Sequence, residues 1–203
     1  MDVKKRAIRQ ALRDQRRRLS AVFVETASAA VYARLCTFPP YQAAAAVVAY
    51  VAHENEVSTA ALLTAVGSSG RPLCLPSSTD GGRLIRWRPG DPLTAGPGGV
   101  LEPSVGEPEP MGTPAVALLP VVAWDERGTR LGRGGGFYDR LFAALTDAVV
   151  RVGLAYEFQE CPRLPRDPWD ISLHYVITER RLVRCGQGEV VPVRSLQKGG
   201  MQL

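Results

Sequence analysis

Hydrophobic positions at the start of the chain recur at the spacing of a helix. Ile8 and Leu12 fall on one face of a predicted helix over residues 3–19. Ser20 is suited to capping a second helix, because its hydroxyl can accept a hydrogen bond from a free N–H of the first turn. This second helix is predicted to run through Leu35, before a pair of prolines closes it off.

Continuous apolar runs farther along predict strands buried inside a sheet. Residues 43–52 (AAAAVVAYVA) and 115–124 (AVALLPVVAW) are two such runs, and the second is expected to be a central strand. Further strands are predicted at 73–76, 84–89, 149–158 and 173–180, with helices at 59–66 and 138–150. Because strands alternate with helices, we predict a layered α/β fold with a central mixed, largely parallel sheet flanked by helices.

Two stretches lack either pattern. Residues 90–114 are rich in proline and glycine, and we expect an extended surface excursion with little regular structure, in which 101–103 touch the body. Residues 186–203 are expected to be a flexible tail. A single domain is therefore predicted over residues 1–185.

The composition is that of a globular chain. Of 203 residues, 45% are hydrophobic and 22% are charged, so a sizeable core can form. No apolar run is long enough to span a membrane, and no signal-peptide pattern follows the basic start. We therefore expect a cytoplasmic protein without a membrane partner. Four dispersed cysteines and only two histidines argue against a zinc site.

The positive charge is concentrated at one end of the chain. Residues 1–20 carry a net charge of +6, whereas the rest of the chain carries −1. A protein that coats nucleic acid would spread its basic residues more widely. The distribution favours one cationic arm with a particular anionic partner, although a basic run is often only a solvated helix face.

The stretch RLGRGGGFYDR, residues 130–140, carries the strongest chemical signal. Its glycines lie between a predicted buried strand and a predicted helix, where free N–H groups can bind phosphate. Arg133 could add a charge-assisted bond, and Asp139 could hold Mg²⁺. An ordinary turn with a capping Asp139 is the alternative. The spacing matches neither a P-loop nor a dinucleotide-binding fingerprint.

Acidic pairs occur at two further places. Glu54 and Glu56 follow a predicted buried strand, in the region where open α/β sheets bind ligands, although at least one of the pair is expected to be merely solvated. Asp167 and Asp170 lie before the last predicted strand, beside a tryptophan that could equally belong to the core, a lid or a ligand platform.

These motifs, in their order, resemble those of a known family. The matching blocks are K-x-x-x-R near the start, NEVST, GRPLCLP, LEP, LLPVVAWDERGTRLGRGGGFYDR, VGLAYEFQ, LP and WDISLHYVIT. The chain resembles the 5-formyltetrahydrofolate cyclo-ligases, also called methenyltetrahydrofolate synthetases, from about Lys4 to Glu179. The fragment RLGxGxGxYD is the most distinctive block.

The resemblance implies a fold related to the sugar-phosphate isomerase and CoA-transferase group. It implies an enzyme that uses ATP and Mg²⁺ to convert 5-formyltetrahydrofolate to 5,10-methenyltetrahydrofolate, with release of ADP and phosphate. In this reaction a phosphorylated formyl group, an imino-phosphate, is the expected intermediate. The partners would be ATP and a reduced folate, with no nucleic acid. The oligomeric state stays open between a monomer and a homodimer.

The resemblance also implies roles for individual residues. Lys5 and Arg9 would hold ATP phosphates, and Asp139 and Asp170 would bind Mg²⁺. The loop that wraps ATP would consist of Arg130, Leu131, Gly132, Arg133, Gly134, Gly135, Gly136, Phe137 and Tyr138. Its members with catalytic roles would be Arg133, Gly134 and Tyr138. The folate would contact Val51, Glu56, Arg133, Gly135 and Phe137.

The chain departs from the family pattern at two positions. Arg133 stands where many members have an aromatic residue, so its role is open between gripping the moving phosphate and lining the pocket. His174 stands where a second acidic residue is common, which leaves the metal ligands open. A non-catalytic folate- or RNA-binding member of the same fold is the alternative function, motivated by the basic N-terminal segment.

Overall fold

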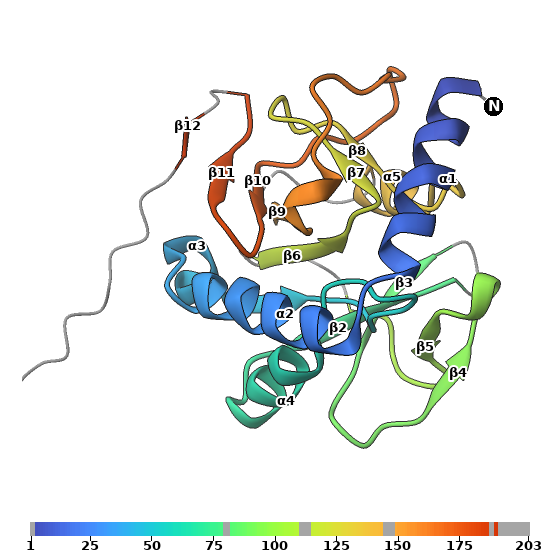
Figure 1. The fold of residues 1–203 in the computed structure, drawn as a ribbon. Helices are drawn as coiled ribbons and strands as arrows, with labels where there is room; N and C mark the ends of the chain where they lie inside the picture. The colour runs from blue at the N-terminus through green and yellow to red at the C-terminus, as the bar shows by residue number, and fades with distance from the viewer. Residues whose placement is uncertain (1–2, 79–81, 110–114, 144–148, 187–188, 191–203) are drawn as a thin grey trace, which may run out of the picture.

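An eight-stranded mixed sheet forms the centre of the computed structural model, which describes residues 3–78, 82–109, 115–143, 149–186 and 189–190 (Figure 1). The helices are α1 (Val3–Arg17), α2 (Ala21–Cys36), α3 (Pro39–Ala43), α4 (Ala60–Ser68) and α5 (Phe137–Ala143), with short 3₁₀ turns at Pro97–Gly99 and Glu157–Gln159. The sheet strands are β1 (Ala46–Val48), β2 (Leu73–Ser77), β3 (Arg83–Arg86), β6 (Ala115–Pro120), β9 (Val149–Leu154), β10 (Tyr175–Ile177), β11 (Leu182–Arg184) and β12 (Glu189–Val190).

The strands lie in the order β12-β11-β10-β9-β6-β1-β2-β3. The five strands from β10 to β2 are parallel. At the edges, β3 pairs antiparallel with β2, β11 pairs antiparallel with β10, and β12 pairs antiparallel with β11. In the register of the central strands, Val47 lies between Leu73 and Val116. The predicted mixed, largely parallel sheet is therefore confirmed.

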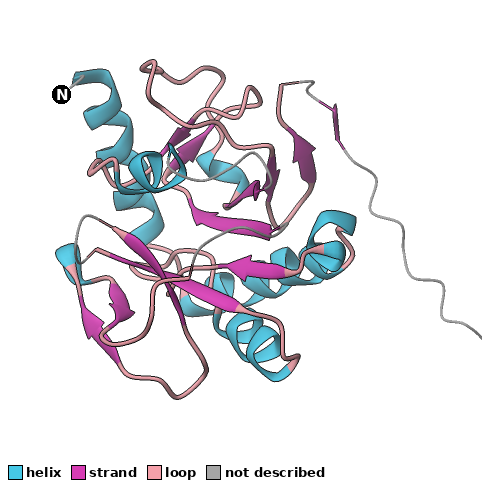
Figure 2. Ribbon diagram, turned by 180° about the vertical axis from the view of Figure 1, so that it is seen from behind, coloured by secondary structure: helices cyan, strands magenta, loops and turns pink. Residues whose placement is uncertain are grey.

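Alternate residues of the central strands enter two cores, one on each face of the sheet. Val47 packs with α2, α3 and α4, whereas its neighbour Val48 packs with Leu141 and Phe142 of α5. In Figure 2, which views the molecule from behind, α2 and α4 lie together on the far side of the sheet. This layering requires strands that are apolar on both faces, which is why the predicted strands read as continuous hydrophobic runs.

The first two helices follow the predicted pattern closely. The backbone N–H of Phe23 donates to Oγ of Ser20 over 3.2 Å, so Ser20 caps α2 as expected. In the described part of the chain, no single helix is long and apolar enough to cross a membrane. Only α1 and α2 taken together reach that length and composition, and they are bent by 107°.

Two predicted strands are shorter than their apolar runs. Of residues 43–52, only those of β1 pair in the sheet, and residues 115–124 divide into β6 and a separate β7 (Ala123–Trp124). The division coincides with contacts from two other elements. The carbonyl of Val121 accepts hydrogen bonds from Gln159 (2.6 Å) and Arg16 (3.2 Å), so it is turned away from the neighbouring strands. β7 then pairs with β8 (Arg130–Leu131).

The proline- and glycine-rich excursion is more regular than predicted. β4 (Leu93–Ala95) and β5 (Leu101–Pro103) form an antiparallel pair around the 97–99 turn, and residues 110–114 lie outside the described ranges. Glu102 is buried and accepts hydrogen bonds from the backbone N–H and the hydroxyl of Ser78, both over 2.7 Å. These bonds attach the excursion to the body at the predicted point.

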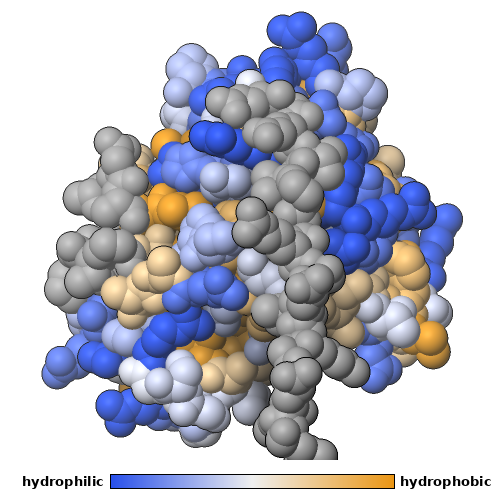
Figure 3. Space-filling view, turned by 90° about the vertical axis from the view of Figure 1, so that its left-hand side faces the viewer, coloured by the Kyte–Doolittle hydropathy of each residue, from blue (hydrophilic) through white to orange (hydrophobic). Residues whose placement is uncertain are grey.

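The sheet also extends into the segment predicted to be a tail. β12 pairs with β11, so regular structure continues as far as Val190, and residues 191–203 lie outside the described part of the chain. Figure 3 shows that, on the face it presents, the uncovered hydrophobic residues lie in small separate groups among hydrophilic ones.

Candidate active site

Two groups of predicted site residues lie near the carboxyl ends of the neighbouring parallel strands β1 and β6. The 51–56 loop follows β1, and a hydrogen bond from the N–H of Val122 to the carbonyl of Leu131 holds the glycine loop, residues 132–136 after β8, near the end of β6. The helix α1 lies alongside β7, β8 and α5 (Figure 1), with Ile8 and Leu12 packed on Ala123 and Leu131. This packing turns the basic side chains of α1 toward both loops.

The glycine loop needs glycine for two physical reasons. Gly134 has φ +109°, a conformation that residues with a Cβ rarely adopt. A Cβ on Gly132 would lie 2.6 Å from Nη1 of Arg130, so any larger residue there would displace that guanidinium from its place against the backbone. Around Gly135, no other group lies within 4 Å of a Cβ built there, which makes this part of the loop accessible.

Arg9 anchors the glycine loop to α1. Its Nε donates to the carbonyl of Gly132 over 2.8 Å, and its side chain passes within 4 Å of the position that a Cβ on Gly134 would take. The predicted proximity of Lys5 and Arg9, four residues apart on one helix face, is therefore present in the fold.

Lys5 is buried and binds two carboxylates. Its Nζ donates to Oδ2 of Asp167 over 2.8 Å and to Oδ2 of Asp170 over 2.5 Å. Burial by itself lowers the pKa of Lys5, but the bonds to both carboxylates outweigh that effect and leave the pKa above its ordinary value. Lys5 therefore stays charged near neutral pH.

Asp139 lies beside this acidic pair. Its Oδ1 accepts the backbone N–H of Ile171, the residue after Asp170, over 3.2 Å, and Nη2 of Arg130 approaches it to 3.4 Å. The two carboxylates predicted to bind a metal are thus brought together from segments far apart in the sequence. His174 is not part of this cluster, because its ring is hydrogen-bonded to Arg151.

Glu56 is buried at the opposite end of α1. Its Oε2 accepts the backbone N–H of His53 over 3.1 Å, and its Oε1 lies 3.4 Å from Nη2 of Arg16. Arg16 is itself 1% exposed and also donates to the carbonyls of Glu54 (2.9 Å) and Val121 (3.2 Å). Burial lowers the pKa of Arg16, but a guanidinium stays protonated under all ordinary conditions.

Arg133 extends from the glycine loop toward this second acidic pair. Its Nη2 lies 3.5 Å from Oε2 of Glu54, and its Nε lies 3.5 Å from Oε1 of Glu56. Its Nη1 donates to the carbonyl of Gly98 over 3.4 Å. The guanidinium therefore contacts the end of the site that holds Glu56.

The remaining predicted residues differ in their access to the site. Tyr138 is half-buried, with its ring 5.4 Å from the guanidinium carbon of Arg130, and burial raises the pKa of its phenol well above the ordinary value. Phe137 packs edge-on against Tyr138, and Val51 packs on the larger core. Leu131 is 1% exposed in the core beneath α1, so its side chain is turned away from the loop.

Comparisons with known proteins show the family of the chain. The family model of the 5-formyltetrahydrofolate cyclo-ligases matches residues 1–179. The chain belongs to this family. It is accordingly an enzyme, as predicted, and the family resemblance read from its motifs is confirmed.

Several relatives align over most of their length. A protein of Haemophilus influenzae named 5-formyltetrahydrofolate cyclo-ligase is 28% identical over 181 residues, which cover 86% of this chain and 97% of that protein. A protein of the same name from Mycolicibacterium smegmatis is 34% identical over 146 residues, 66% of this chain and 74% of its own. The solved 5,10-methenyltetrahydrofolate synthetase of Aquifex aeolicus is 31% identical, with a TM-score of 0.79 over 95% of this chain and 98% of that one.

In this family member the residues fit the magnesium and phosphate groups that the resemblance implies. Nε of Arg130 is buried and has no hydrogen-bond partner among the described residues, which suits an anion arriving beside it. Within the same part of the chain, no three acidic, histidine or cysteine side chains form a metal cluster. Two carboxylates suffice for Mg²⁺ when phosphate oxygens complete its ligands, and Asp139 and Asp170 would be these two carboxylates.

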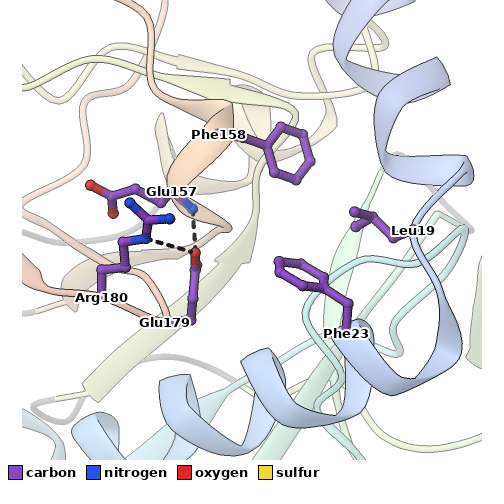
Figure 4. A pocket seen from close by; sticks show the side chains of 6 residues that line it. All are labelled: Leu19, Phe23, Glu157, Phe158, Glu179 and Arg180. Atoms are coloured by element: carbon purple, nitrogen blue, oxygen red, sulfur yellow. Dashed lines mark hydrogen bonds and ion pairs between the residues drawn. The ribbon is translucent and has the colours of Figure 1, made fainter.

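Two surface hollows lie elsewhere on this cyclo-ligase fold. One, of about 400 Å³, lies between the start of α2 and the 157–159 turn, where Phe23 and Phe158 face each other across it (Figure 4). The other, of about 470 Å³, lies between the end of α4 and the end of β3. Neither contains a residue of the glycine loop, so the chemistry of the side chains locates the site better than the size of a hollow.

Sequence reasoning missed two members of the site. Arg16 was not singled out, although it continues the row of Lys5, Arg9 and Arg13 along one helix face. Asp167 was noted beside Asp170 but was given no role, and the structure brings it to Lys5. The helical spacing of the basic residues is the signal that could have found Arg16.

Proposed function

We propose that this enzyme converts 5-formyltetrahydrofolate to 5,10-methenyltetrahydrofolate, using ATP and Mg²⁺ and releasing ADP and phosphate. One observation carries the proposal. A single helix supplies Lys5 and Arg9 to the metal-binding carboxylates and the glycine loop, and Arg16 to Glu56. This arrangement suits a reaction that needs a phosphoryl donor at one end and a folate at the other.

The chemistry explains why a phosphoryl donor is required. A formamide oxygen is a poor leaving group, and transfer of the γ-phosphoryl group of ATP to it creates a good one. N10 of the folate then attacks the formyl carbon and loses its proton, and phosphate departs with the electron pair of the C–O bond. The protein has to hold the reactants in line and stabilise charge on the transferring group.

The side chains divide between these tasks. Lys5, Arg9 and Arg130 supply cationic donors to the ATP phosphates, and the exposed backbone of the glycine loop supplies N–H groups. Asp139 and Asp170 would hold Mg²⁺, which neutralises phosphate charge when bound. Lys5 would exchange its carboxylate partners for phosphate oxygens when the nucleotide enters.

Glu56 is suited to the folate end of the reaction. The pyrimidine edge of a pterin presents an amino group and a ring N–H side by side, which a carboxylate can accept together. Burial strengthens such a bond, and the partners of Glu56 fix its direction. Val51 and Phe137 supply apolar surface, and Tyr138, kept neutral by its raised pKa, can donate a hydrogen bond.

The direct test follows the absorbance of the methenyl product in a mixture of the full chain, ATP, Mg²⁺ and 5-formyltetrahydrofolate. We expect product only when both ATP and Mg²⁺ are present. Omission of each is the control, and the folded state is checked by circular dichroism. A folded protein that forms no product would overturn the proposal.

The structure weakens the alternative of an RNA-binding protein. The basic residues of α1 that face the body already bind acidic partners or the glycine loop, among them Lys5, Arg9, Arg13 and Arg16. Fewer charges are therefore left for phosphates of a nucleic acid than the net charge of the segment suggests.

A further inference from the structure

Arg133 contacts three residues from two other segments, the 51–56 loop and the 97–99 turn, and all three contacts are long. Its guanidinium lies 3.5 Å from Glu54, 3.5 Å from Glu56 and 3.4 Å from the carbonyl of Gly98. A strong ion pair between a guanidinium and a carboxylate is about 2.7–2.9 Å long. These contacts orient Arg133 while leaving it easy to detach from any single partner.

Glu54 is itself fixed by shorter bonds to α1. Its carboxylate accepts from Arg17 over 2.6 Å and from Arg13 over 2.9 Å, and its backbone adopts φ +51°. Burial alone would raise the pKa of Glu54, but the bonds from Arg17 and Arg13 outweigh it and lower the pKa to about 2. Glu54 is therefore a charged, firmly placed group that the proposed reaction does not otherwise use.

The two carboxylates beside Arg133 would have different partners once a folate is bound. If Glu56 accepts the pterin edge, its Oε1 is no longer free to attract Nε of Arg133. Glu54 then becomes the remaining carboxylate partner of that guanidinium. Arg133 belongs to the glycine loop, whose backbone is open at Gly135, so its guanidinium lies between the proposed phosphate-binding loop and the carboxylate that would accept the pterin edge.

We propose that Glu54 is a positioning residue, which keeps Arg133 beside the formyl group while the pterin occupies Glu56. Arg133 then stabilises the charge on the phosphoryl group as it moves to the formyl oxygen. This inference rests on the proposed function and assigns Arg133 to the phosphoryl transfer rather than to the rim of the pocket.

A double-mutant cycle on the full chain tests the proposal. The variants Glu54→Gln, Arg133→Gln and the double variant are compared with the wild type by kcat and by KM for folate and ATP. We expect Glu54→Gln to lower kcat about 10-fold, with KM for folate changed less than about 3-fold. In the Arg133→Gln background, the same substitution is expected to change kcat less than about 2-fold.

Arg17→Gln is the matched control. It removes the 2.6 Å bond to Glu54 but leaves both partners of the contact between Glu54 and Arg133 in place. We expect its kcat to stay within about 2-fold of the wild type, because Arg13 still holds Glu54. Thermal unfolding of every variant separates loss of folding from loss of positioning.

Each other outcome contradicts a specific step. If Glu54→Gln lowers kcat equally in both backgrounds, or if Arg17→Gln lowers it as much as Glu54→Gln, Glu54 only ties α1 to the body and the inference is wrong. If the wild type forms no product, the proposed function itself is wrong. This result is distinguishable from failure of the inference about Glu54, because it is seen in the wild type alone.

Discussion

The side chain of Asp139 is oriented by contacts with its neighbours in the absence of a metal. The backbone N–H of Ile171 and the guanidinium of Arg130 both approach the same oxygen, Oδ1. A preset carboxylate loses little freedom when it binds a cation, and this favours a defined magnesium site. Through Asp139, the two contacts also connect β8 to the segment that carries Asp170.

Substitution of Asp139 tests the magnesium role. We expect Asp139→Ala to reduce turnover at least ~100-fold by weakening the binding of Mg²⁺–ATP, because a carboxylate oxygen is lost from the ligand set. Steady-state rates over a range of Mg²⁺ concentrations provide the measurement. Asp139→Asn keeps a hydrogen-bond acceptor for Ile171 and controls for folding. Normal activity of the alanine variant at ordinary Mg²⁺ would refute the role.

Gly134 tests the approach of phosphate to the loop. Gly134→Val places branched carbons at an exposed loop position and forces valine to φ +109°. We expect KM for ATP to rise at least ~10-fold. Gly70→Val is the control, because Gly70 has φ +77° in a remote turn with open space around it. An unchanged KM for ATP in Gly134→Val would contradict the loop assignment.

At the scale of elements, α1 works as a connector between the two ends of the site. Lys5 binds the acidic pair at one end, Arg9 binds the glycine loop, and Arg16 binds the loop that carries Glu56. Ile8 and Leu12 hold the helix against β7 and β8 between these points. Under the proposed function, the helix would set the spacing between the phosphoryl donor and the folate.

Substitution of Arg16 should weaken the attachment of α1 to the loop that carries Glu56. We expect Arg16→Met to lower the free energy of unfolding by about 3 kcal/mol, because it removes the buried guanidinium beside the carboxylate of Glu56 and one donor each from the carbonyls of Glu54 and Val121. Urea unfolding followed by circular dichroism measures the change. The exposed Arg18, substituted in the same way, should change it by less than about 0.5 kcal/mol. Equal effects of both variants would contradict the role of Arg16.

At the scale of the whole molecule, charge is arranged so that the basic helix is neutralised internally. The segment with a net charge of +6 faces acidic side chains contributed by the 53–56 loop and the 167–170 loop. Ion pairs of this kind connect parts of the chain that no local preference would bring together. The stability of the fold should therefore depend on the ionisation of these carboxylates.

The pH dependence of stability gives a measurable consequence. The pKa of Glu54 is about 2 in the fold, below its ordinary 4.5, so the unfolded chain binds more protons between these values. The contribution of Glu54 is complete above about pH 4.5 and is lost as the pH falls toward 2. We expect Glu54→Gln to make the free energy of unfolding fall less steeply between pH 5 and pH 2.5. Urea unfolding at each pH checks this, with the exposed Glu25→Gln as a control of unchanged slope.

The sequence by itself determined the features that depend on local preference. The apolar runs predicted a largely parallel sheet, Ser20 predicted the start of α2, and the glycines predicted a loop between a strand and a helix. These follow from backbone conformation, hydrogen bonding at helix ends and burial, which a few neighbouring residues decide. The order of the motifs gave the resemblance to the family, which rests on known sequence patterns rather than on these local preferences.

Only the tertiary structure decided which charged groups meet. Lys5 and Asp170 are 165 positions apart, and Arg133 and Glu54 are 79 apart, so no local pattern connects them. The break after β6 likewise depends on Arg16, a residue from another element. Pairing across such distances is set by how the elements pack, and this packing turns Arg133 toward Glu54 and Glu56. The role of Arg133, open in the sequence, becomes a testable assignment only through that contact.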